Sequence, residues 1–268
     1  MANLLPTETL QILKCTLCNE LLTVPPILTI SQDATKHKCG RCKDIETEIS
    51  SRNLIYEKVA ELYSYPCTYS GCKEVLKWND IEQHELNCVH RTLTCPVSWS
   101  CNETISIAEL NSHCLVEHRK NVFKDNLLIS FDEPLDKSKI TVMLFIQNNT
   151  SFLVFRVVTT ENIWIKVFSF LPLFNCMYDF EICTSADECC LSFKNPVEMF
   201  MERKHCKKCI MNDCNNELHK KGKKKIDKAV YEAGFQKIDK NMVVQLKLVD
   251  LKLKVIFGHE KRKSIYSL

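Results

Sequence analysis

Eight cysteine and histidine residues in the middle of the chain form two consecutive quartets with the spacing of zinc ligands. Each quartet opens with two cysteines that have four or five residues between them and closes, after eleven further residues, with a pair four or five positions apart. Zinc needs four such donors around one tetrahedral point, so two short segments commonly supply two ligands each. The eight candidate ligands are Cys67, Cys72, His84 and Cys88, followed by Cys95, Cys101, His113 and His118.

Two predicted helices carry the closing pair of each quartet. His84 and Cys88 are related as i and i+4, so they share one face of a helix that we expect to begin at Asp80. The segment Ser106–Glu109 has the pattern of a capping box. It predicts a second helix, which presents the two histidines of the second quartet.

Cysteine usage favours metal ligands over disulfides. The chain has 17 cysteines, an odd number, in 268 residues. Its first residues lack the basic start and apolar run of a secretory leader, and no stretch approaches the ~18 apolar residues of a membrane span. We therefore expect thiols and metal-bound thiolates in a cytoplasmic protein without membrane contacts, with the nucleus as a further compartment. None of the five glycines falls in a phosphate-binding pattern.

Two Cys-x-x-Cys motifs precede the quartets. Cys15 and Cys18 form the first motif, and Cys39 and Cys42 form the second, with twenty residues between them. Taken alone, the two motifs predict a zinc site with four cysteine ligands.

Two further segments accompany these motifs, and together they resemble a known family. Val24-Pro25-Pro26-Ile27-Leu28 follows the first motif, and Arg52-Asn53-Leu54-Ile55-Tyr56-Glu57-Lys58-Val59-Ala60 follows the second. With the two quartets behind them, these segments resemble the seven-in-absentia (SIAH) family of RING-type ubiquitin ligases. The resemblance implies that Leu17 contacts a ubiquitin-conjugating enzyme. It also implies a SIAH-type zinc finger over the two quartets and a C-terminal TRAF-like sandwich that dimerises and binds protein substrates.

The RING-like module departs from the family pattern. In a RING, ligand pairs one and three hold one zinc ion and pairs two and four hold the other. By the resemblance, the two Cys-x-x-Cys motifs are pairs one and three. Thr29 and Ile30 lie where the family has the cysteine of pair two. His37 is one residue too close to the second motif to match the histidine of pair two. Pair four is missing, because no cysteine occurs between Cys42 and Cys67. We therefore expect a degenerate RING with one whole zinc site, and whether His37 binds a second metal stays open.

β-Branched and aromatic residues dominate the chain after residue 139. They predict strands at Ile140–Ile146, Phe152–Val158, Ile163–Phe170, Tyr178–Cys183 and Met242–Phe257. Asn148-Asn149-Thr150 reads as the hairpin turn between the first two strands. The predicted fold class is α+β and multi-domain, with small zinc-stabilised modules followed by an antiparallel, TRAF-like β-sandwich.

The same features divide the chain into domains. Ile55, Val59 and Leu62 recur at i, i+4 and i+7 and predict a connecting helix whose apolar stripe packs in a core. The predicted segments are an N-terminal tail (1–14), a degenerate RING-like module (15–51), the connecting helix (52–64), a double zinc finger (65–119), the sandwich (120–258) and a C-terminal tail (259–268).

A further cysteine-rich cluster interrupts the predicted sandwich within a basic insertion at 202–225. Cys206, Cys209, Cys214 and His219 have the spacing of a zinc knuckle with its last two ligand types exchanged. The cluster either binds metal or is a solvated loop or nuclear import signal. RNA-binding knuckles use aromatic residues to stack bases, and none lies within this cluster. Five other cysteines have no ligand pattern and are expected to be small core residues: Cys114, Cys176, Cys183, Cys189 and Cys190.

Three functions are compatible with these patterns. The first is a SIAH-type ubiquitin ligase that promotes ubiquitination and proteasomal degradation of bound proteins, with no catalytic residue of its own. The second is a weak or inactive zinc-binding adaptor of the same architecture. The third, a nucleic-acid binder, is disfavoured by a net charge of only +3. We expect about three Zn²⁺ per chain, or four with the 206–219 cluster, and a homodimer or a heterodimer with an intact relative.

Overall fold

The computed structural model of the chain forms two compact units, Met1–Arg91 and Thr92–Leu268. The boundary falls between the two quartets, so the predicted double finger is divided between the units. The structure describes residues 4–30, 33, 35–42, 50–98, 100–125, 127–130, 139–159, 161–173, 175–184, 189–201, 231, 234–245 and 248–256.

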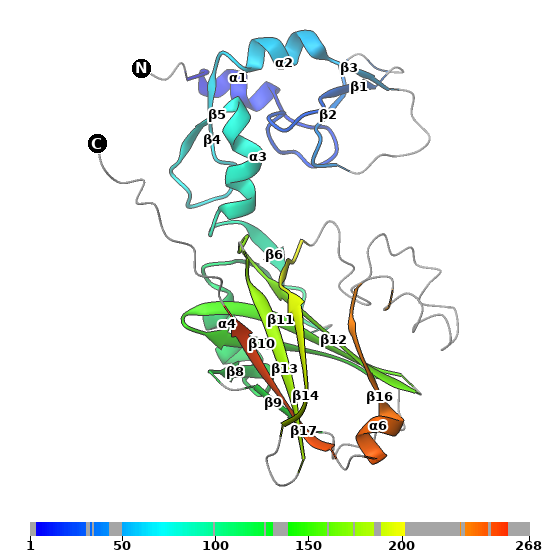
Figure 1. Ribbon diagram of the computed structural model, residues 1–268. Helices are drawn as coiled ribbons and strands as arrows, with labels where there is room; N and C mark the ends of the chain where they lie inside the picture. Colours follow the sequence, from blue (N-terminus) through cyan, green and yellow to red (C-terminus); the bar gives the residue numbers. More distant parts are fainter. Residues whose placement is uncertain are drawn as a thin grey trace, which may run out of the picture. The chain divides into compact units, whose positions relative to one another are not determined.

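The described residues of the first unit form three short helices and two small sheets (Figure 1). One sheet has the strand order β2-β1-β3 and the other pairs β4 with β5, all antiparallel. The elements are α1 (Thr7–Ile12), β1 (Leu28–Ile30), β2 (His37–Lys38), β3 (Ser50–Arg52), α2 (Leu54–Ala60), β4 (Ser64–Pro66), β5 (Val75–Lys77) and α3 (Trp78–Asn87).

One hydrophobic core joins the RING-like module to the first finger. Trp78, at the start of α3, lies between Tyr56 of α2 and Tyr65 of β4, with ring centroids 6.2 and 6.0 Å away. Two of the cysteines from the Cys-x-x-Cys motifs are buried in the same cluster. Its buried members are Cys15, Leu22, Val24, Ile27, Cys39, Ala60, Tyr65, Trp78 and Ile81.

Helix α3 begins earlier than the sequence predicts. It starts at Trp78, so Asp80 lies inside the first turn and is not the residue that caps the helix. Burial explains the difference, because Trp78 and Ile81 are both 4% exposed and anchor this turn in the core. An acidic side chain in the first turn still interacts favourably with the helix dipole.

Helix α2 presents its apolar stripe to solvent, so the prediction that this stripe packs in a core is wrong. Ile55, Val59 and Leu62 are 82%, 51% and 69% exposed. The helix instead buries Glu57 and Ala60 on its other side. The i, i+4, i+7 spacing identified the helix but not the face that is buried.

Glu57 explains why α2 turns that side inward. Its carboxylate accepts a hydrogen bond from the backbone N–H of Ile27 at 2.8 Å. It also forms an ion pair with Arg52, at 2.8 Å. The hydrogen bonds from Arg52 lower the pKa of Glu57 although burial raises it. The carboxylate therefore holds the segment after Pro25-Pro26 against the start of α2, and this contact uses residues of both segments that resemble the family.

The second unit contains the second finger and two larger sheets (Figure 1). One sheet has the order β15-β12-β11-β10-β8, with β16 also paired to β12, and the other has the order β14-β13-β17-β9. The finger elements are β6 (Thr92–Thr94), β7 (Thr104–Ser106), α4 (Leu110–Glu117) and the 3₁₀ turn η1 (Arg119–Asn121). The sheet elements are β8 (Val122–Lys124), β9 (Leu127–Ser130), β10 (Lys139–Gln147), β11 (Thr150–Val158), β12 (Asn162–Ser169), β13 (Met177–Thr184), β14 (Cys189–Pro196), β15 (Glu198–Met199), β16 (Gln236–Asp239), α6 (Lys240–Gln245) and β17 (Leu248–Ile256).

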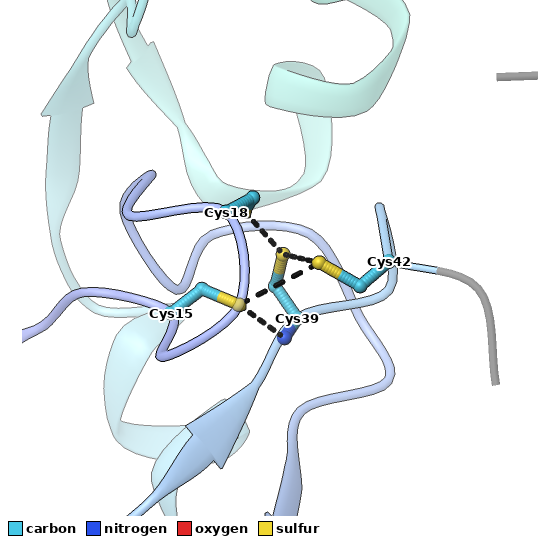
Figure 2. A group of neighbouring side chains, drawn as sticks. All are labelled: Cys15, Cys18, Cys39 and Cys42. Atoms are coloured by element: carbon cyan, nitrogen blue, oxygen red, sulfur yellow. Dashed lines mark hydrogen bonds between the residues drawn. The ribbon is translucent and has the colours of Figure 1, made fainter. Parts of the chain in front are cut away.

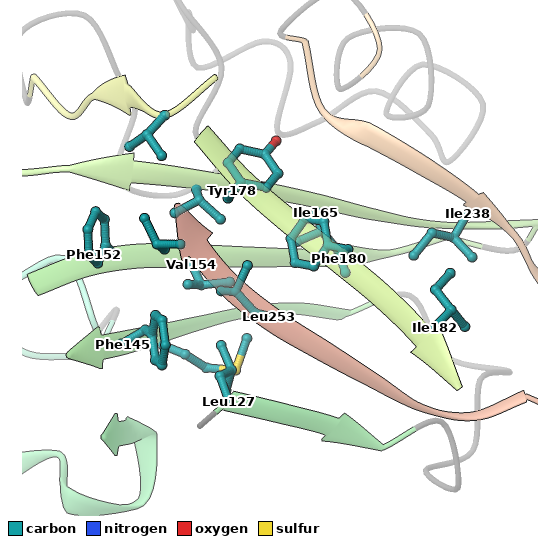
Figure 3. Packing of buried hydrophobic residues seen from close by; sticks show 14 of the residues in the cluster. Leu127, Phe145, Phe152, Val154, Ile165, Tyr178, Phe180, Ile182, Ile238 and Leu253 are labelled. Atoms are coloured by element: carbon teal, nitrogen blue, oxygen red, sulfur yellow. The ribbon is translucent and has the colours of Figure 1, made fainter. Parts of the chain in front are cut away.

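The two sheets pack face to face in a sandwich, which confirms the predicted fold class. Figure 3 shows Phe145, Phe152 and Val154 of the β10–β12 sheet facing Phe180 and Leu253 of the other. Pairing is antiparallel except for the short contacts of β8 with β10 and of β12 with β15. The chain is therefore α+β, with Cys/His clusters followed by a largely β region.

The predicted hairpin turn is confirmed. Gln147 pairs with Thr150 at the ends of β10 and β11, so Asn148 and Asn149 form a two-residue loop. Their φ angles are 50° and 59°. Positive φ at both central positions is the type I′ conformation, which matches the twist of a hairpin and which asparagine tolerates well.

The last predicted strand, Met242–Phe257, is only partly correct. Residues 240–245 form α6, and the strand β17 begins at Leu248. The Asp239 side chain accepts a hydrogen bond from the N–H of Asn241 at 2.7 Å, which favours a helical start there. Val243 is buried in the sandwich core, so the prediction of a strand over 242–245 is wrong, while Leu248 lies in a strand as predicted.

Candidate metal centres

The four cysteines of the two Cys-x-x-Cys motifs come together in one cluster (Figure 2). The Sγ–Sγ distances are 3.7 Å for Cys15–Cys42, 3.6 Å for Cys18–Cys39 and 4.0 Å for Cys39–Cys42. A tetrahedral zinc ion with Zn–S bonds of about 2.3 Å places its sulfur ligands about 3.8 Å apart. A disulfide would need about 2.05 Å. The cluster therefore fits a four-thiolate zinc site.

Backbone N–H groups favour the thiolate form of Cys15, whereas burial raises the pKa of Cys18 and of Cys42 in the same cluster. Burial raises the pKa of Cys15, but hydrogen bonds from the backbone of Cys18, Cys39 and Leu17 outweigh it and lower that pKa to about 7. One of these bonds, from Cys39 N–H to Cys15 Sγ, measures 3.4 Å. Metal ligation requires the thiolate, so the backbone around Cys15 suits a metal-bound cysteine.

The first finger brings together Cys67, Cys72, His84 and Cys88. The loop between β4 and β5 supplies the first two ligands, and α3 supplies His84. Cys88 directly follows α3 in extended conformation, so the prediction that it shares a helix face with His84 is wrong. Cys67 Sγ lies 3.9 Å from Cys88 Sγ, and Cys72 Sγ lies 3.5 Å from His84 Nε2. The second distance matches the ~3.6 Å edge between a sulfur and a nitrogen ligand of tetrahedral zinc.

The second finger brings together Cys95, Cys101, His113 and His118. Cys101 Sγ lies 3.6 Å from His113 Nε2. His118 Nε2 is buried and has no hydrogen-bond partner in the part of the chain that the structure describes. A buried imidazole nitrogen without a partner is costly unless it binds something, and a metal ion is the partner that this donor set suits.

The capping box predicted for this finger is present. The Ser106 hydroxyl donates to Glu109 Oε2 at 2.7 Å, and the Glu109 N–H donates to Ser106 Oγ at 3.3 Å. The bonds close the turn before α4, which runs from Leu110 to Glu117, so His113 lies in the helix and His118 directly after it.

Two residues near the second finger were missed by sequence reasoning. Glu103 Oε2 lies 3.0 Å from His113 Nδ1, which leaves Nε2 to face the sulfur ligands. The thiol of Cys114 hydrogen-bonds Cys95. This hydrogen bond is the main reason why the pKa of Cys95 is lowered to about 4. Carboxylates behind metal-bound histidines are common, so a glutamate two residues after a ligand cysteine could have been flagged.

The described residues contain three such Cys/His groups, and no fourth forms around His37. His37 Nδ1 lies 3.2 Å from the Thr29 hydroxyl, which also accepts a hydrogen bond from Asn53 at 3.4 Å. The 206–219 cluster and the 202–225 insertion lie outside the described residues. So do the side chains of Cys183, Cys189 and Cys190, while Cys114 and Cys176 are buried as expected.

The expected conjugating-enzyme contact, Leu17, is 45% exposed on the loop between Cys15 and Cys18. The preceding residue holds this loop in place. The Thr16 hydroxyl and N–H both donate to the carbonyl of His37, at 2.7 and 2.9 Å, and the Thr16 hydroxyl accepts from His37 N–H at 3.0 Å. An apolar side chain is thus presented to solvent from a fixed loop.

The fold and the three clusters define a zinc-finger protein with a C-terminal sandwich. The Sina zinc-finger family matches residues 58–128. Human E3 ubiquitin-protein ligase SIAH2 is 30% identical over 123 residues, which are 42% of this chain and 37% of that protein. E3 ubiquitin-protein ligase sina of Schistosoma mansoni is 28% identical over 118 residues (41% and 31%), and E3 ubiquitin-protein ligase SINA-like 10 of Arabidopsis thaliana is 27% identical over 177 residues (60% and 49%).

These matches confirm the resemblance to the seven-in-absentia family of E3 ubiquitin ligases. The matched segments cover between 31% and 49% of the lengths of these relatives. Among the described helices, none combines the length and apolar character that crossing a membrane requires.

Proposed function

We propose that this chain acts as a seven-in-absentia-type ubiquitin ligase that promotes degradation of the proteins it binds. The observation that carries the proposal is the order of the three Cys/His clusters, with a Sina zinc finger behind a four-cysteine cluster that displays Leu17. The similar proteins are named E3 ubiquitin-protein ligases, and the same activity is proposed for this chain.

In the proposed mechanism the ligase makes no covalent bond to ubiquitin. A conjugating enzyme carries ubiquitin as a thioester and docks on the exposed Leu17 loop. The sandwich holds the substrate, so a substrate lysine is brought close to the thioester, and the gain in rate comes from proximity and orientation. Zinc at the proposed ligand quartets would cross-link the short loops and keep the docking surface in shape.

We propose three zinc ions per chain, held by the three quartets described above, with a fourth only if the 206–219 cluster also binds metal. The convergence of the donor atoms at tetrahedral spacing supports the first three. Elemental analysis of reduced, dialysed protein measures this number directly.

The residues at the place of the second RING zinc site support a proposal of weak ligase activity, because they bond to one another. Where the family has a cysteine and a histidine ligand, this chain has the contact of Thr29 with His37 and with Asn53. The second docking loop of a RING would then lack its metal anchor. We therefore propose feeble autonomous activity, which pairing with an intact relative would strengthen, and a non-catalytic adaptor is the second candidate function.

The sandwich is the proposed site for substrates and for self-association. Strand β14 (Cys189–Pro196) is the last strand of its sheet among the described residues. An outer strand can pair with an extended peptide through its free backbone groups. Sedimentation of the chain at micromolar concentration should give a dimer, and a monomer at all concentrations would contradict this part of the proposal.

The decisive experiment is ubiquitination with purified full-length chain and a panel of conjugating enzymes. Leu17→Ala should reduce chain formation to background while zinc content stays at the wild-type value. Leu54→Ala is the matched control, because Leu54 is also an exposed leucine, at 57%, in the same unit. Activity that is brisk in the wild type and equal in both variants would contradict both the docking site and the weak-ligase proposal.

A further inference from the structure

A buried ion pair links the four-cysteine cluster to the helix of the first finger. Arg41, between Cys39 and Cys42, donates from Nε to Glu85 Oε2 at 2.7 Å and from Nη2 to Glu85 Oε1 at 2.5 Å. The Arg41 and Glu85 side chains are only 2% and 10% exposed. Two parallel hydrogen bonds in a buried setting give the pair a fixed geometry.

Each partner of this pair is next to a proposed metal ligand. Arg41 directly precedes Cys42, and Glu85 directly follows His84 on α3. A ligand that moves when its metal leaves must therefore move one end of the pair. Removing one partner would leave the other charge buried without compensation, which is strongly destabilising.

The same arginine also holds the loop that carries Leu17. Arg41 Nη1 donates to the carbonyl of Leu21 at 2.6 Å, and Nη2 donates to the Thr23 hydroxyl at 2.7 Å. The two acceptors lie three and five residues after Cys18, the last residue of the first Cys-x-x-Cys motif. The first finger makes a second contact with this region, because the Thr68 hydroxyl hydrogen-bonds the Glu20 carboxylate.

We propose that the Arg41–Glu85 pair couples metal binding at the four-cysteine cluster to metal binding at the first finger. Metal binding at one site then raises the metal affinity of the other site, and by thermodynamic linkage the effect is reciprocal. Through the Leu21 and Thr23 contacts, the metal-loaded finger also fixes the Leu17 loop. Arg41 and Glu85 are then positioning residues for the conjugating enzyme, a consequence that rests on the proposed function.

The coupling is tested with Co²⁺, whose visible spectrum distinguishes a four-thiolate site from a site with imidazole ligands. In full-length chain, His84→Ala should lower the Co²⁺ affinity of the four-cysteine cluster about tenfold. In an Arg41→Met/Glu85→Leu background, the same change should have an effect of about threefold or less. An unchanged affinity in the first case, or an equal effect in both backgrounds, would overturn the proposal.

A second pair of variants keeps the test valid if the double substitution prevents folding. Glu85→Gln keeps the size of the side chain and an oxygen that can accept a hydrogen bond from Arg41, so it disturbs the pair less than removal of a whole partner. Glu82→Gln is its matched control on the exposed side of the same helix. Glu85→Gln should weaken Co²⁺ binding at the four-cysteine cluster by several-fold, although residue 85 is not a ligand of either site. Equal Co²⁺ affinities in the two variants would contradict the coupling.

Binding of a conjugating enzyme, measured by titration with zinc-loaded chain, tests the consequence for the Leu17 loop. Glu85→Gln should weaken this binding relative to Glu82→Gln. If both variants bind the enzyme equally well, the positioning role is wrong. If the wild type binds no conjugating enzyme, the proposed function fails, while the Co²⁺ titration still decides whether the two metal sites are coupled.

Discussion

Glu103 determines which nitrogen of His113 is available to a metal ion. The carboxylate lies 3.0 Å from Nδ1 and favours the proton there, so the lone pair of Nε2 points to the cluster. No equivalent partner of His118 Nε2 exists among the described residues, which fits direct ligation of that nitrogen. The ligand set alone does not define the second finger, because the groups behind the ligands orient them.

Replacing Glu103 should therefore weaken the second finger without removing a ligand. We expect Glu103→Ala to reduce zinc affinity at this site about 10- to 100-fold. Competition with a chromophoric chelator measures the affinity. Glu117→Ala, at the exposed end of α4, is the control and should have no effect, whereas equal affinities of the two variants would exclude an orienting role.

Helix α2 shows how an element is placed by contacts outside itself. The Glu57 carboxylate is bound by Ile27 N–H and Arg52, and this buries the side of the helix opposite to Ile55 and Val59. The apolar stripe then faces solvent. Hydrogen bonds and the ion pair offset the cost of burying this carboxylate, and Ala60 and Tyr56 of α2 supply the apolar contacts with the core.

Substitutions in α2 and α3 should therefore differ in their effect on stability. Ile55→Ala should change the free energy of unfolding by less than about 0.5 kcal/mol, because Ile55 is exposed. Ile81→Ala on α3 removes a buried side chain and should cost about 2–5 kcal/mol. Urea denaturation of zinc-loaded chain measures both, and a large effect of Ile55→Ala would show that this stripe is covered in solution.

At the scale of the whole molecule, each finger shares the core of a different compact unit. The first finger packs with the four-cysteine module. The second finger contributes Leu93, Val97 and Leu110 to a cluster with residues of β10–β12 such as Leu144 and Phe155. The β10–β12 sheet is thus buried on both faces, by β13 and β17 on one side and by the finger on the other.

Loss of metal from the second finger should consequently destabilise the sandwich. We expect His118→Ala to lower the free energy of unfolding of the second unit by more than about 2 kcal/mol, because a structural zinc contributes folding energy to the core that it organises. Hydrogen exchange of β11 amides measures this effect. His84→Ala, in the first unit, should leave β11 unchanged, and equal exchange in the two variants would contradict a shared core.

Local patterns in the sequence were sufficient for the twelve residues of the three clusters, the Asn148-Asn149 turn and the strands β10–β13, because spacing, turn chemistry and β-propensity act over a few residues. The same patterns do not predict β16, and they predict a strand where residues 242–245 belong to α6, since the Asp239 cap and the burial of Val243 favour a helix there. Only the tertiary structure decided which face of α2 is buried, which unit each finger joins and that Arg41 pairs with Glu85. Those choices depend on contacts between residues far apart in the chain, and no local period encodes them.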